Sequence, residues 1–427
     1  STLDPHSFPT RRSSDLRGDF MNISGIIVEY NPLHNGHVYH INKTKELTNC
    51  DVLICVMSGN FTQRGIPSSI DKWTKTKMAI NNGVDLVLEL PTIYSVSSAE
   101  FFAQGAISLL NSLGIVDNIC FGSEHGDIND ICNISNILLK EPAEYKLLLK
   151  TYLSKGITYP LARAKALYEY LTNSNMSMSN LLLGDFLNSS NNILGIEYCK
   201  SLIKLNSSIT PYTLKRKGAS YNSTFINNEF SSATAIRRYV KENGILTNLK
   251  DYVPPSVFTE IRNLYSKDTN FIFEDSMFPY IKYKSATSKN SLINLPDVSE
   301  GLDNKIIKSL QHNLTYANTL ESIKSKRYTY SRISRILCQY FIGFDDFDTT
   351  RLRSIPCPYA RVLGFNSKGK SILKSIKTNS SIPLYTKISK KTNETLSLDI
   401  QSTRAYSILN KSVDPSSDYL ISPIIIK

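Results

Sequence analysis

The most constraining feature of this 427-residue chain is a series of four short apolar runs, each followed by a stretch of helix length. The runs are rich in Val, Ile and Leu, as expected of strands that are buried on both faces. They cover Ile26–Glu29, Val52–Met57, Asp85–Leu90 and Val116–Phe121. The helices predicted between these runs cover Gly36–Leu47, Ile70–Asn82 and Ser98–Leu113. This alternation predicts a parallel sheet with helices on each face.

We therefore predict an α/β fold that begins with a Rossmann-like domain with a parallel sheet over residues 21–250, followed by a helical region and a mixed basic C-terminal domain. Ligands are expected at the carboxyl ends of the strands. Pro254–Pro255 is the predicted boundary before the region 251–427. Further predicted segments are the helices Leu161–Leu171, Asn191–Leu205, Ala233–Glu242, Tyr330–Phe344 and Gly369–Lys377 and the strands Tyr212–Lys215 and Ala360–Phe365.

Residues 1–20 are expected to be a non-native leader. Ser7–Leu16 can be back-translated into the end of a widely used sequencing adapter, and Arg17–Asp19 into a purine-rich ribosome-binding sequence just before Met21. A short disordered or targeting arm is the alternative. Under either interpretation the segment takes no part in the predicted fold.

The net charge of +12 is unevenly distributed along the chain. Residues 21–250 carry 21 basic and 18 acidic side chains, whereas residues 251–427 carry 25 basic and 16 acidic ones. The window 321–400 alone holds 15 basic and 6 acidic side chains. A surplus confined to one region favours a polyanionic partner there, nucleic acid before membrane.

The cysteines and the hydropathy pattern bear on location. The seven cysteines form no CxxC pair, which argues against a disulfide framework or a zinc site and favours a reduced, cytoplasmic compartment. Apolar runs are all too short for a membrane-spanning helix, which needs about 20 residues. We therefore expect no membrane partner.

The strongest chemical signal follows the first predicted strand, in the segment GIIVEYNPLHNGHVYH (25–40). His34 and His37 flank Gly36, and His37 begins the predicted helix. A helix start with its free N–H groups favours a phosphate, and two imidazoles there can donate to the same anion. This arrangement suits transfer at a nucleotide α-phosphate. The alternative is that both histidines are turn residues satisfied by backbone; His40 is expected to pack or to support them.

An HxGH motif after the first strand is the signature of a nucleotidyltransferase superfamily, and the wider sequence is more specific. It contains, in order, the blocks GIIVEYNPLHNGH (25–37), SGNFTQRG (58–65), DKWTKTKMA (71–79), FGSE (121–124), NNILGIEY (191–198), LKRKGASY (214–221), SSATAIRR (231–238) and YARVLGFNSKGK (359–370). With these blocks the chain resembles the bacterial tRNA(Met) cytidine acetate ligase family over almost the whole length from Met21. Eight ordered blocks are far more specific than any one of them.

The resemblance implies a reaction in two steps. Acetate attacks the α-phosphate of ATP to give acetyl-adenylate and pyrophosphate. The exocyclic amine of the wobble cytidine of elongator tRNA(Met) then takes the acetyl group and releases AMP. Magnesium is expected to accompany the polyphosphate, whereas the choice of acetate and of this tRNA rests on the resemblance alone.

The resemblance also implies an ATP site. His34 and His37 would act in catalysis. The ATP-binding residues would be Ile27, Val28, Glu29, Tyr30, Asn31, Pro32, Leu33, His34, Asn35, Gly36, His37, Val38, Tyr39, His40, Gly122, Asn191 and Arg216.

Several of these residues have an equally simple structural explanation. Gly122 can be an ordinary strand-ending glycine, Asn191 a helix cap, and Arg216 part of a solvated Lys-Arg-Lys run. Ser231 and Ser232 can cap a helix whose N–H groups face a triphosphate, with Arg237 as a clamp, or can simply cap a helix. Asn60, Gln63 and Arg64 follow the second strand and are expected near the same cleft. Asp71 and Lys72 can form an exposed ion pair instead.

The basic segment around the predicted helix 330–344 is the expected tRNA-binding surface. Its cations are Lys324, Lys326, Arg327, Arg332 and Arg335, interleaved with Tyr328 and Tyr330. Cations neutralise phosphates and tyrosines stack on unpaired bases. A solvated helix face is the alternative for any single arginine. Two other functions stay open at this point: a small-molecule adenylyltransferase, and a non-enzymatic RNA-binding protein.

Overall fold

A computed structural model describes most of the chain from Met21 onwards. The described ranges are 21–174, 183–216, 232–244, 247–266, 271–288, 291–299, 301–325, 327–389 and 393–427. The expected leader at residues 1–20 lies outside them.

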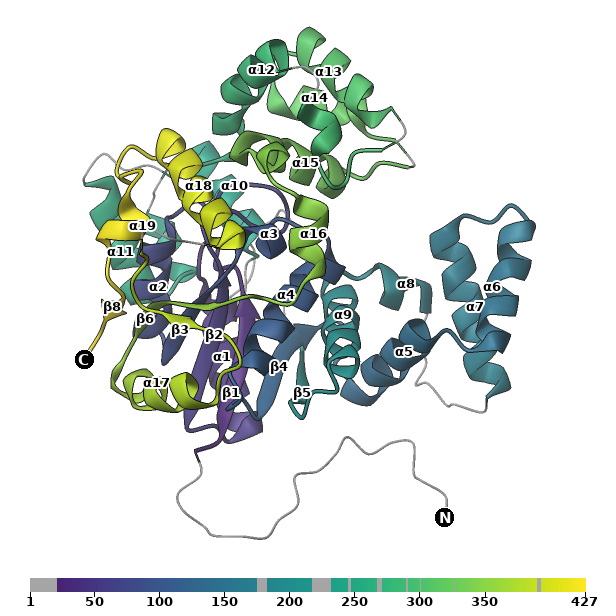
Figure 1. Cartoon of the computed structure of the whole chain (residues 1–427), viewed down its shortest axis with the longest axis horizontal. Coiled ribbons are helices and arrows are strands. Elements are labelled where there is room, and N and C mark those ends of the chain that lie inside the picture. Colours follow the sequence, from purple (N-terminus) through teal and green to yellow (C-terminus); the bar gives the residue numbers. More distant parts are fainter. Residues whose placement is uncertain are drawn as a thin grey trace.

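A mainly parallel sheet forms the centre of the molecule (Figure 1). Five parallel strands stand in the order β5-β4-β1-β2-β3, and their bounds are β1 Ile23–Val28, β2 Val52–Ser58, β3 Leu86–Leu90, β4 Asn118–Ser123 and β5 Thr210–Lys215. Each of the four apolar runs forms a strand, as does the predicted segment Tyr212–Lys215. The predicted α/β fold is confirmed.

The continuous apolar character of the strands reflects cores on both faces of the sheet. In β2, Leu53, Cys55 and Met57 join one hydrophobic cluster, while Ile54 and Val56 join the other. Successive side chains of a strand point to opposite faces, so both sets must be apolar. Helices of the first face are α1 Asn35–Thr48, α2 Lys72–Asn81, α10 Ala233–Asn243 and α11 Pro255–Tyr265; helices of the second include α4 Ala99–Ser112, α5 Ile128–Lys140 and α9 Ser190–Lys204.

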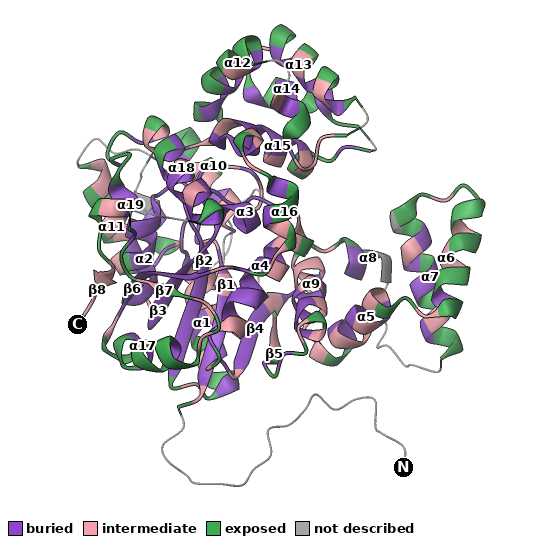
Figure 2. Ribbon diagram, viewed as in Figure 1, coloured by how far each residue is buried: buried purple, intermediate pink, exposed green. Residues whose placement is uncertain are grey.

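Two helical parts project from this layer (Figure 1). One is a hairpin of α6 Ala143–Ser154 and α7 Tyr159–Asn173, whose outward faces are largely exposed (Figure 2). The other comprises α12 Phe278–Thr287, α13 Leu302–His312, α14 Tyr316–Ile323 and α15 Tyr330–Ile342. The remaining short helices of the described residues are α3 Thr92–Ser95, α8 Leu183–Asn188, α16 Thr349–Ser354 and the 3₁₀ helices Thr247–Asp251, Glu274–Met277, Ser291–Asn294 and Phe344–Asp346.

The C-terminal segment returns to the sheet, which the sequence did not indicate. Strand β6 Ala360–Phe365 pairs antiparallel with β3, and the short strands β7 Leu384–Tyr385 and β8 Ile424–Ile425 pair with β6. Helices α17 Ser367–Asn379, α18 Glu394–Leu409 and α19 Ser417–Leu420 accompany them. Both hydrophobic clusters contain residues from before and after residue 250. The proposed division at that residue therefore concerns which half binds which substrate, not two separate cores.

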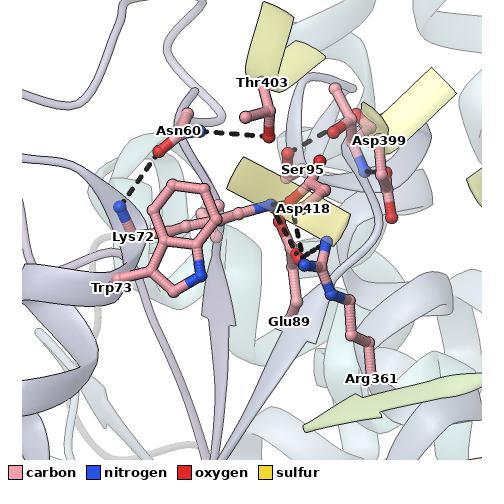
Figure 3. A network of polar contacts seen from close by, with 12 residues as sticks. Asn60, Lys72, Trp73, Glu89, Ser95, Arg361, Asp399, Thr403 and Asp418 are labelled. Atoms are coloured by element: carbon pink, nitrogen blue, oxygen red, sulfur yellow. Dashed lines mark hydrogen bonds and ion pairs between the residues drawn. The ribbon is translucent and has the colours of Figure 1, made fainter. Parts of the chain in front are cut away.

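A buried group of charges joins this C-terminal segment to the first half (Figure 3). Lys72 at the start of α2 pairs with Glu89 of β3 at 2.7 Å and with Asp418 of α19 at 2.8 Å. Arg361 of β6 pairs with the same two carboxylates, each at 2.8 Å. The two cations and two anions balance, which is the condition under which charges can be buried. Lys72 is therefore internal, and Asp71 instead caps α2 by accepting from the N–H groups of Trp73 and Thr74.

Asp399 of α18 lies beside this group and gives a pH-dependent prediction. Burial first, and then the charge of Glu89, raise the pKa of Asp399 to about 7. Because an unfolded Asp titrates near 4, the folded state binds the extra proton between about pH 4 and 7, and this residue makes stability fall as pH rises through that range. We expect the stability of Asp399→Asn, relative to the unmodified protein, to be higher at pH 8 than at pH 5. Urea unfolding of both proteins at pH 5 and pH 8 measures this difference in the free energy of unfolding. The same difference at both pH values would refute the prediction.

Candidate active site

The predicted loop after β1 lines a cavity of about 220 Å³ at the carboxyl ends of β1, β4 and β5. This is where ligands bind in open parallel sheets. The predicted residues that line the cavity are Ile27, Val28, Glu29, Tyr30, Asn31, His34, Gly36, His37, Tyr39, His40, Gly122, Asn191 and Arg216. The structure thus gathers residues from four separate sequence blocks around one space.

Four predicted residues of the loop do not line the cavity. Leu33 is fully buried in the hydrophobic cluster on the α1 side of the sheet. Pro32 and Val38 also lie outside the cavity lining. The backbone N–H and the side-chain amide of Asn35 donate to the carbonyls of Tyr252 and Asp251. Leu33 and Asn35 therefore hold the loop against the rest of the protein.

His34 and His37 cap the start of α1 reciprocally. His34 has the extended backbone of an N-cap residue, and its Nδ1 accepts from the N–H of Gly36 at 3.1 Å. Nδ1 of His37 accepts from the N–H of His34 at 3.2 Å. The two rings are stacked with their centroids 3.7 Å apart. Because each Nδ1 is an acceptor, each neutral ring carries its proton on Nε2, which leaves Nε2–H as the donor that can reach a ligand.

Burial and neighbouring arginines keep these imidazoles neutral. Desolvation, with smaller contributions from Arg216 and Arg237, lowers the pKa of His34 to about 3. Desolvation and then His34 lower the pKa of His37 well below its ordinary value. Neutral imidazoles in this position can donate hydrogen bonds to an anion but are poor acids at pH 7, which favours stabilisation of developing charge over proton transfer.

The start of α10 faces the same cavity. Ser232 caps this helix by accepting from the N–H of Ala235 at 3.1 Å, and Ser232 and Thr234 both line the cavity. Arg237 donates to the carbonyl of Asn31 at 2.7 Å and to Thr234 at 3.3 Å. Arg237 therefore ties α10 to the loop after β1 while lining the cavity. Ser231 and the residues that follow Arg216 in the LKRKGASY block lie outside the described residues.

Gly122 and Asn191 contribute to the cavity from β4 and α9. A side chain added at Gly122 would begin 3.4 Å from Cγ of Arg216, so Gly122 and the Arg216 side chain lie next to each other in the cavity wall. Asn191 is in the first turn of α9, where Ser189 occupies the cap position. Its amide nitrogen donates to Glu124 at 2.6 Å. Asn191 is thus not the cap, although capping was one of its two predicted roles.

Two of the three residues predicted near the cavity from the loop after β2 line it. Gln63 and Arg64 line it, and the N–H of Gln63 donates to the Glu29 carboxylate at 2.6 Å. The side chain of Asn60 points away, because it accepts from the N–H of Lys72 at 3.0 Å and contacts Thr403 (Figure 3).

Lys75 is a residue that sequence reasoning missed. Its buried ammonium lies within 3.0 Å of the carbonyl oxygens of Glu29, Ser58 and Gly59 and of the Ser68 hydroxyl, so it joins the ends of β1 and β2. Burial lowers its pKa to about 8. The only sequence signal is a lysine on the apolar face of the predicted helix 70–82, four residues after Asp71.

The basic segment around α15 is only partly available to a ligand. Arg327 is exposed, whereas Arg332 donates to the carbonyl of Asp297 at 2.8 Å and lies over the ring of Tyr328. Arg335 is half-buried, and desolvation lowers its pKa. Lys326 lies outside the described residues.

Comparisons with known proteins bear directly on this site. A family model described as HIGH Nucleotidyl Transferase matches residues 21–419. A protein of Clostridium novyi named tRNA(Met) cytidine acetate ligase is 58% identical over 407 residues, which are 95% of this chain and 100% of the relative. The chain belongs to the tRNA(Met) cytidine acetate ligase family. The predicted family is confirmed.

Other members of this ligase family agree. The Clostridium kluyveri protein of the same name is 55% identical over 406 residues, covering 95% of this chain and 99% of its own length. The crystal structure of Thermotoga maritima TmcAL without ligand superposes with a TM-score of 0.86 at 33% identity, covering 95% of this chain and all of that one. A second structure of TmcAL, bound with alpha-thio ATP, gives a TM-score of 0.84 at 32% identity, covering 95% and 99%.

Among the residues that the structure describes, no helix is long and apolar enough to cross a membrane.

Proposed function

We propose that this protein is an ATP-dependent ligase that acetylates the wobble cytidine of elongator tRNA(Met). The observation that carries the proposal is the pair of stacked, neutral imidazoles of His34 and His37 at the start of α1, which lines the cavity. The names of the curated relatives supply the acyl group and the acceptor. The TmcAL structure with an ATP analogue supports ATP as the nucleotide.

In the first step, a carboxylate oxygen of acetate forms a bond to the α-phosphorus of ATP, and the bond from that phosphorus to the bridging oxygen of the β-phosphate breaks. Pyrophosphate leaves and acetyl-adenylate remains. Negative charge builds on the non-bridging and leaving oxygens, and the Nε2–H groups of His34 and His37 are suited to stabilise it. Arg216, Arg237 and the N-terminus of α10 are suited to hold the remaining phosphates.

In the second step, the exocyclic amine of cytidine attacks the acetyl carbonyl, AMP leaves, and the amine loses a proton. A wobble base is unpaired in its loop, so presenting it to the cavity costs little unstacking energy. The half of the chain after residue 250 is proposed to hold the tRNA.

Magnesium is proposed to enter with ATP. Within the described residues no group of three or more His, Cys, Asp or Glu side chains could hold a metal ion. The acidic residue that lines the cavity is Glu29, and its carboxylate already accepts from the N–H of Gln63. These residues fit an ion held chiefly by the phosphates and water rather than by a protein cage.

A cytoplasmic location is also proposed. None of the seven cysteines forms a disulfide, and the thiol of Cys132 donates to the sulfur of Cys199 at 3.7 Å. A compartment that keeps neighbouring thiols reduced suits this arrangement.

The test of the function is incubation of the purified protein with ATP, labelled acetate and total tRNA. The proposal expects label in tRNA that depends on both ATP and acetate, and N4-acetylcytidine after nuclease digestion. Pyrophosphate release with a nucleotide precursor and without tRNA would instead identify a small-molecule adenylyltransferase. Binding of tRNA with no turnover of ATP would identify a non-enzymatic RNA-binding protein.

The tRNA-binding surface is tested at Arg327, the exposed arginine of the predicted set. If Arg327 contacts a phosphate, Arg327→Gln is expected to reduce the slope of log K against log salt concentration by about 0.7–0.9. Filter binding of tRNA at a series of salt concentrations measures this slope. Lys43→Gln, which removes a surface cation of α1, is the matched control and should leave the slope unchanged. Equal slopes in both variants and the unmodified protein would place the contact elsewhere.

A further inference from the structure

Glu124, directly after β4, binds the first turn of α9 through three donors. Its Oε1 accepts from the side-chain amide of Asn191 at 2.6 Å and from the backbone N–H of Asn191 at 3.3 Å. Its Oε2 accepts from the backbone N–H of Asn192 at 2.9 Å. The carboxylate therefore accepts from two of the free backbone N–H groups at this helix start and from the side-chain amide of Asn191.

This contact fixes which way the Asn191 amide points. The oxygen and nitrogen of an asparagine amide look alike in shape, so the hydrogen-bond network must decide between the two orientations. An ionised carboxylate can only accept, so the group that faces Glu124 must be the NH₂ group. The amide oxygen of Asn191, a residue that lines the cavity, therefore faces away from Glu124.

Apolar side chains line the cavity on the same side of α9 as Asn191. Leu194 and Tyr198 lie three and seven residues further along α9, on the same helix face, and both line the cavity. Phe121 of β4, whose ring centroid is 5.4 Å from that of Tyr198, and Phe102 of α4 complete this wall. An amide oxygen in such a wall accepts from one donor of a ligand, and a ligand without that donor would leave the oxygen buried and unpaired.

We propose that Glu124 is a positioning residue for nucleotide selection: it holds the Asn191 amide so that its oxygen accepts from an N–H or O–H donor of the bound nucleoside. This inference rests on the proposed use of ATP. The donor can be the exocyclic amine of adenine or a ribose hydroxyl, since both present a hydrogen to an acceptor. The histidines and arginines of the cavity are assigned to the phosphates and are not involved in this choice.

The decisive experiment compares two single variants with their combination. In Glu124→Gln an NH₂ group replaces one of the two carboxylate oxygens, both of which accept from N–H donors of Asn191 or Asn192. Two donors then face each other, so the Asn191 amide loses its fixed orientation. In Asn191→Asp two carboxylates face each other. In the double variant, the new amide at position 124 can donate to one oxygen at position 191, and the other oxygen again faces the cavity as an acceptor.

The readouts are the dissociation constant of ATP, by calorimetry, and KM and kcat in acetate-dependent exchange of pyrophosphate into ATP. Loss of one hydrogen bond with a buried acceptor left unpaired is expected to raise KM and the dissociation constant about 5- to 100-fold in each single variant, with kcat within about threefold. The double variant is expected to recover to within about threefold of the unmodified protein. A merely structural defect would lower the unfolding temperature without this selective rise in KM.

Nucleotide analogues identify the donor. Purine riboside triphosphate lacks the amine, and 2′-deoxy-ATP and 3′-deoxy-ATP each lack one hydroxyl. The unmodified protein should bind one of the three at least about tenfold more weakly than ATP, and Glu124→Gln should lose that preference. If the unmodified protein binds all three analogues as tightly as ATP, the proposal is overturned.

Asp127→Asn is the matched control. Asp127 belongs to the same loop and accepts from the N–H groups of Asn129 and Asp130 at the start of α5, away from the cavity lining. It should lower the unfolding temperature as Glu124→Gln does but leave ATP binding unchanged. An unchanged ATP dissociation constant in Glu124→Gln would refute the role of Glu124. Absence of ATP binding or of pyrophosphate exchange by the unmodified protein would refute the proposed function instead.

Discussion

Replacing His34 by Asn is expected to lower the rate of adenylate formation about 10²–10³-fold, the usual effect of removing one donor that stabilises an oxyanion. Asn is as good an N-cap residue as any, because its side-chain oxygen can accept from an N–H of the first turn. His34→Asn therefore keeps the cap that Nδ1 of His34 provides to Gly36 and removes the Nε2–H group. The variant separates the chemical role of this residue from its structural one.

The measurement is the steady-state rate of acetate-dependent exchange of labelled pyrophosphate into ATP, together with thermal unfolding. His37→Ala should abolish adenylate formation, and in addition should lose about 1 kcal/mol of stability because the N–H of His34 loses its acceptor. Both variants should still bind tRNA. His312→Asn, at the exposed end of α13, is the matched control. A fully active His34→Asn variant would show that the histidine serves only as a cap.

Arg361→Met is expected to destabilise the protein by about 3–5 kcal/mol, because it leaves Glu89 and Asp418 with a single cation between them in the interior. Burial alone would raise the pKa of Asp418, but the charges of Lys72 and Arg361 together outweigh burial and lower this pKa to about 2. Once Arg361 is lost, one of the two carboxylates must be buried without compensation or take up a proton.

Urea unfolding followed by circular dichroism measures this loss. Adding Asp418→Asn to Arg361→Met should recover part of the stability, since it removes the uncompensated charge. Arg351→Met is the control, because Arg351 pairs with Glu394 at the surface, where an ion pair contributes at most about 1 kcal/mol. Equal effects of Arg351→Met and Arg361→Met would show that the buried group of charges adds no stability.

The local features of the fold were predictable because short segments encode them. The apolar run Val52–Met57 is a strand with a core on each face, and the Asn-Pro turn followed by HNGH begins a helix. The predicted helix Tyr330–Phe344 ends in the structure at Ile342, where Gly343 adopts a left-handed conformation with φ of 93°. Such signals depend on residues within one or two turns of each other.

The partners of the charged residues were not predictable in the same way. Asp71 and Lys72 are adjacent in sequence, yet Lys72 pairs with Glu89 and Asp418. Arg332 is predicted on an RNA-binding surface, and the sequence did not indicate that it also donates to the carbonyl of Asp297. A cation has the same sequence signature whether it meets solvent, a phosphate or a buried carboxylate, and only the folded chain distinguishes these cases.

By itself, the sequence determined the alternation of strands and helices, the family, and the position of the two histidines at the first strand end, because periodicity and short motifs are local properties. The tertiary structure alone decided that β6 pairs with β3, that Lys75 joins the ends of β1 and β2, and that the amide of Asn191 donates to Glu124. These contacts join residues that belong to different elements and lie far apart along the chain. Local sequence patterns do not predict which distant donors and acceptors folding brings into contact.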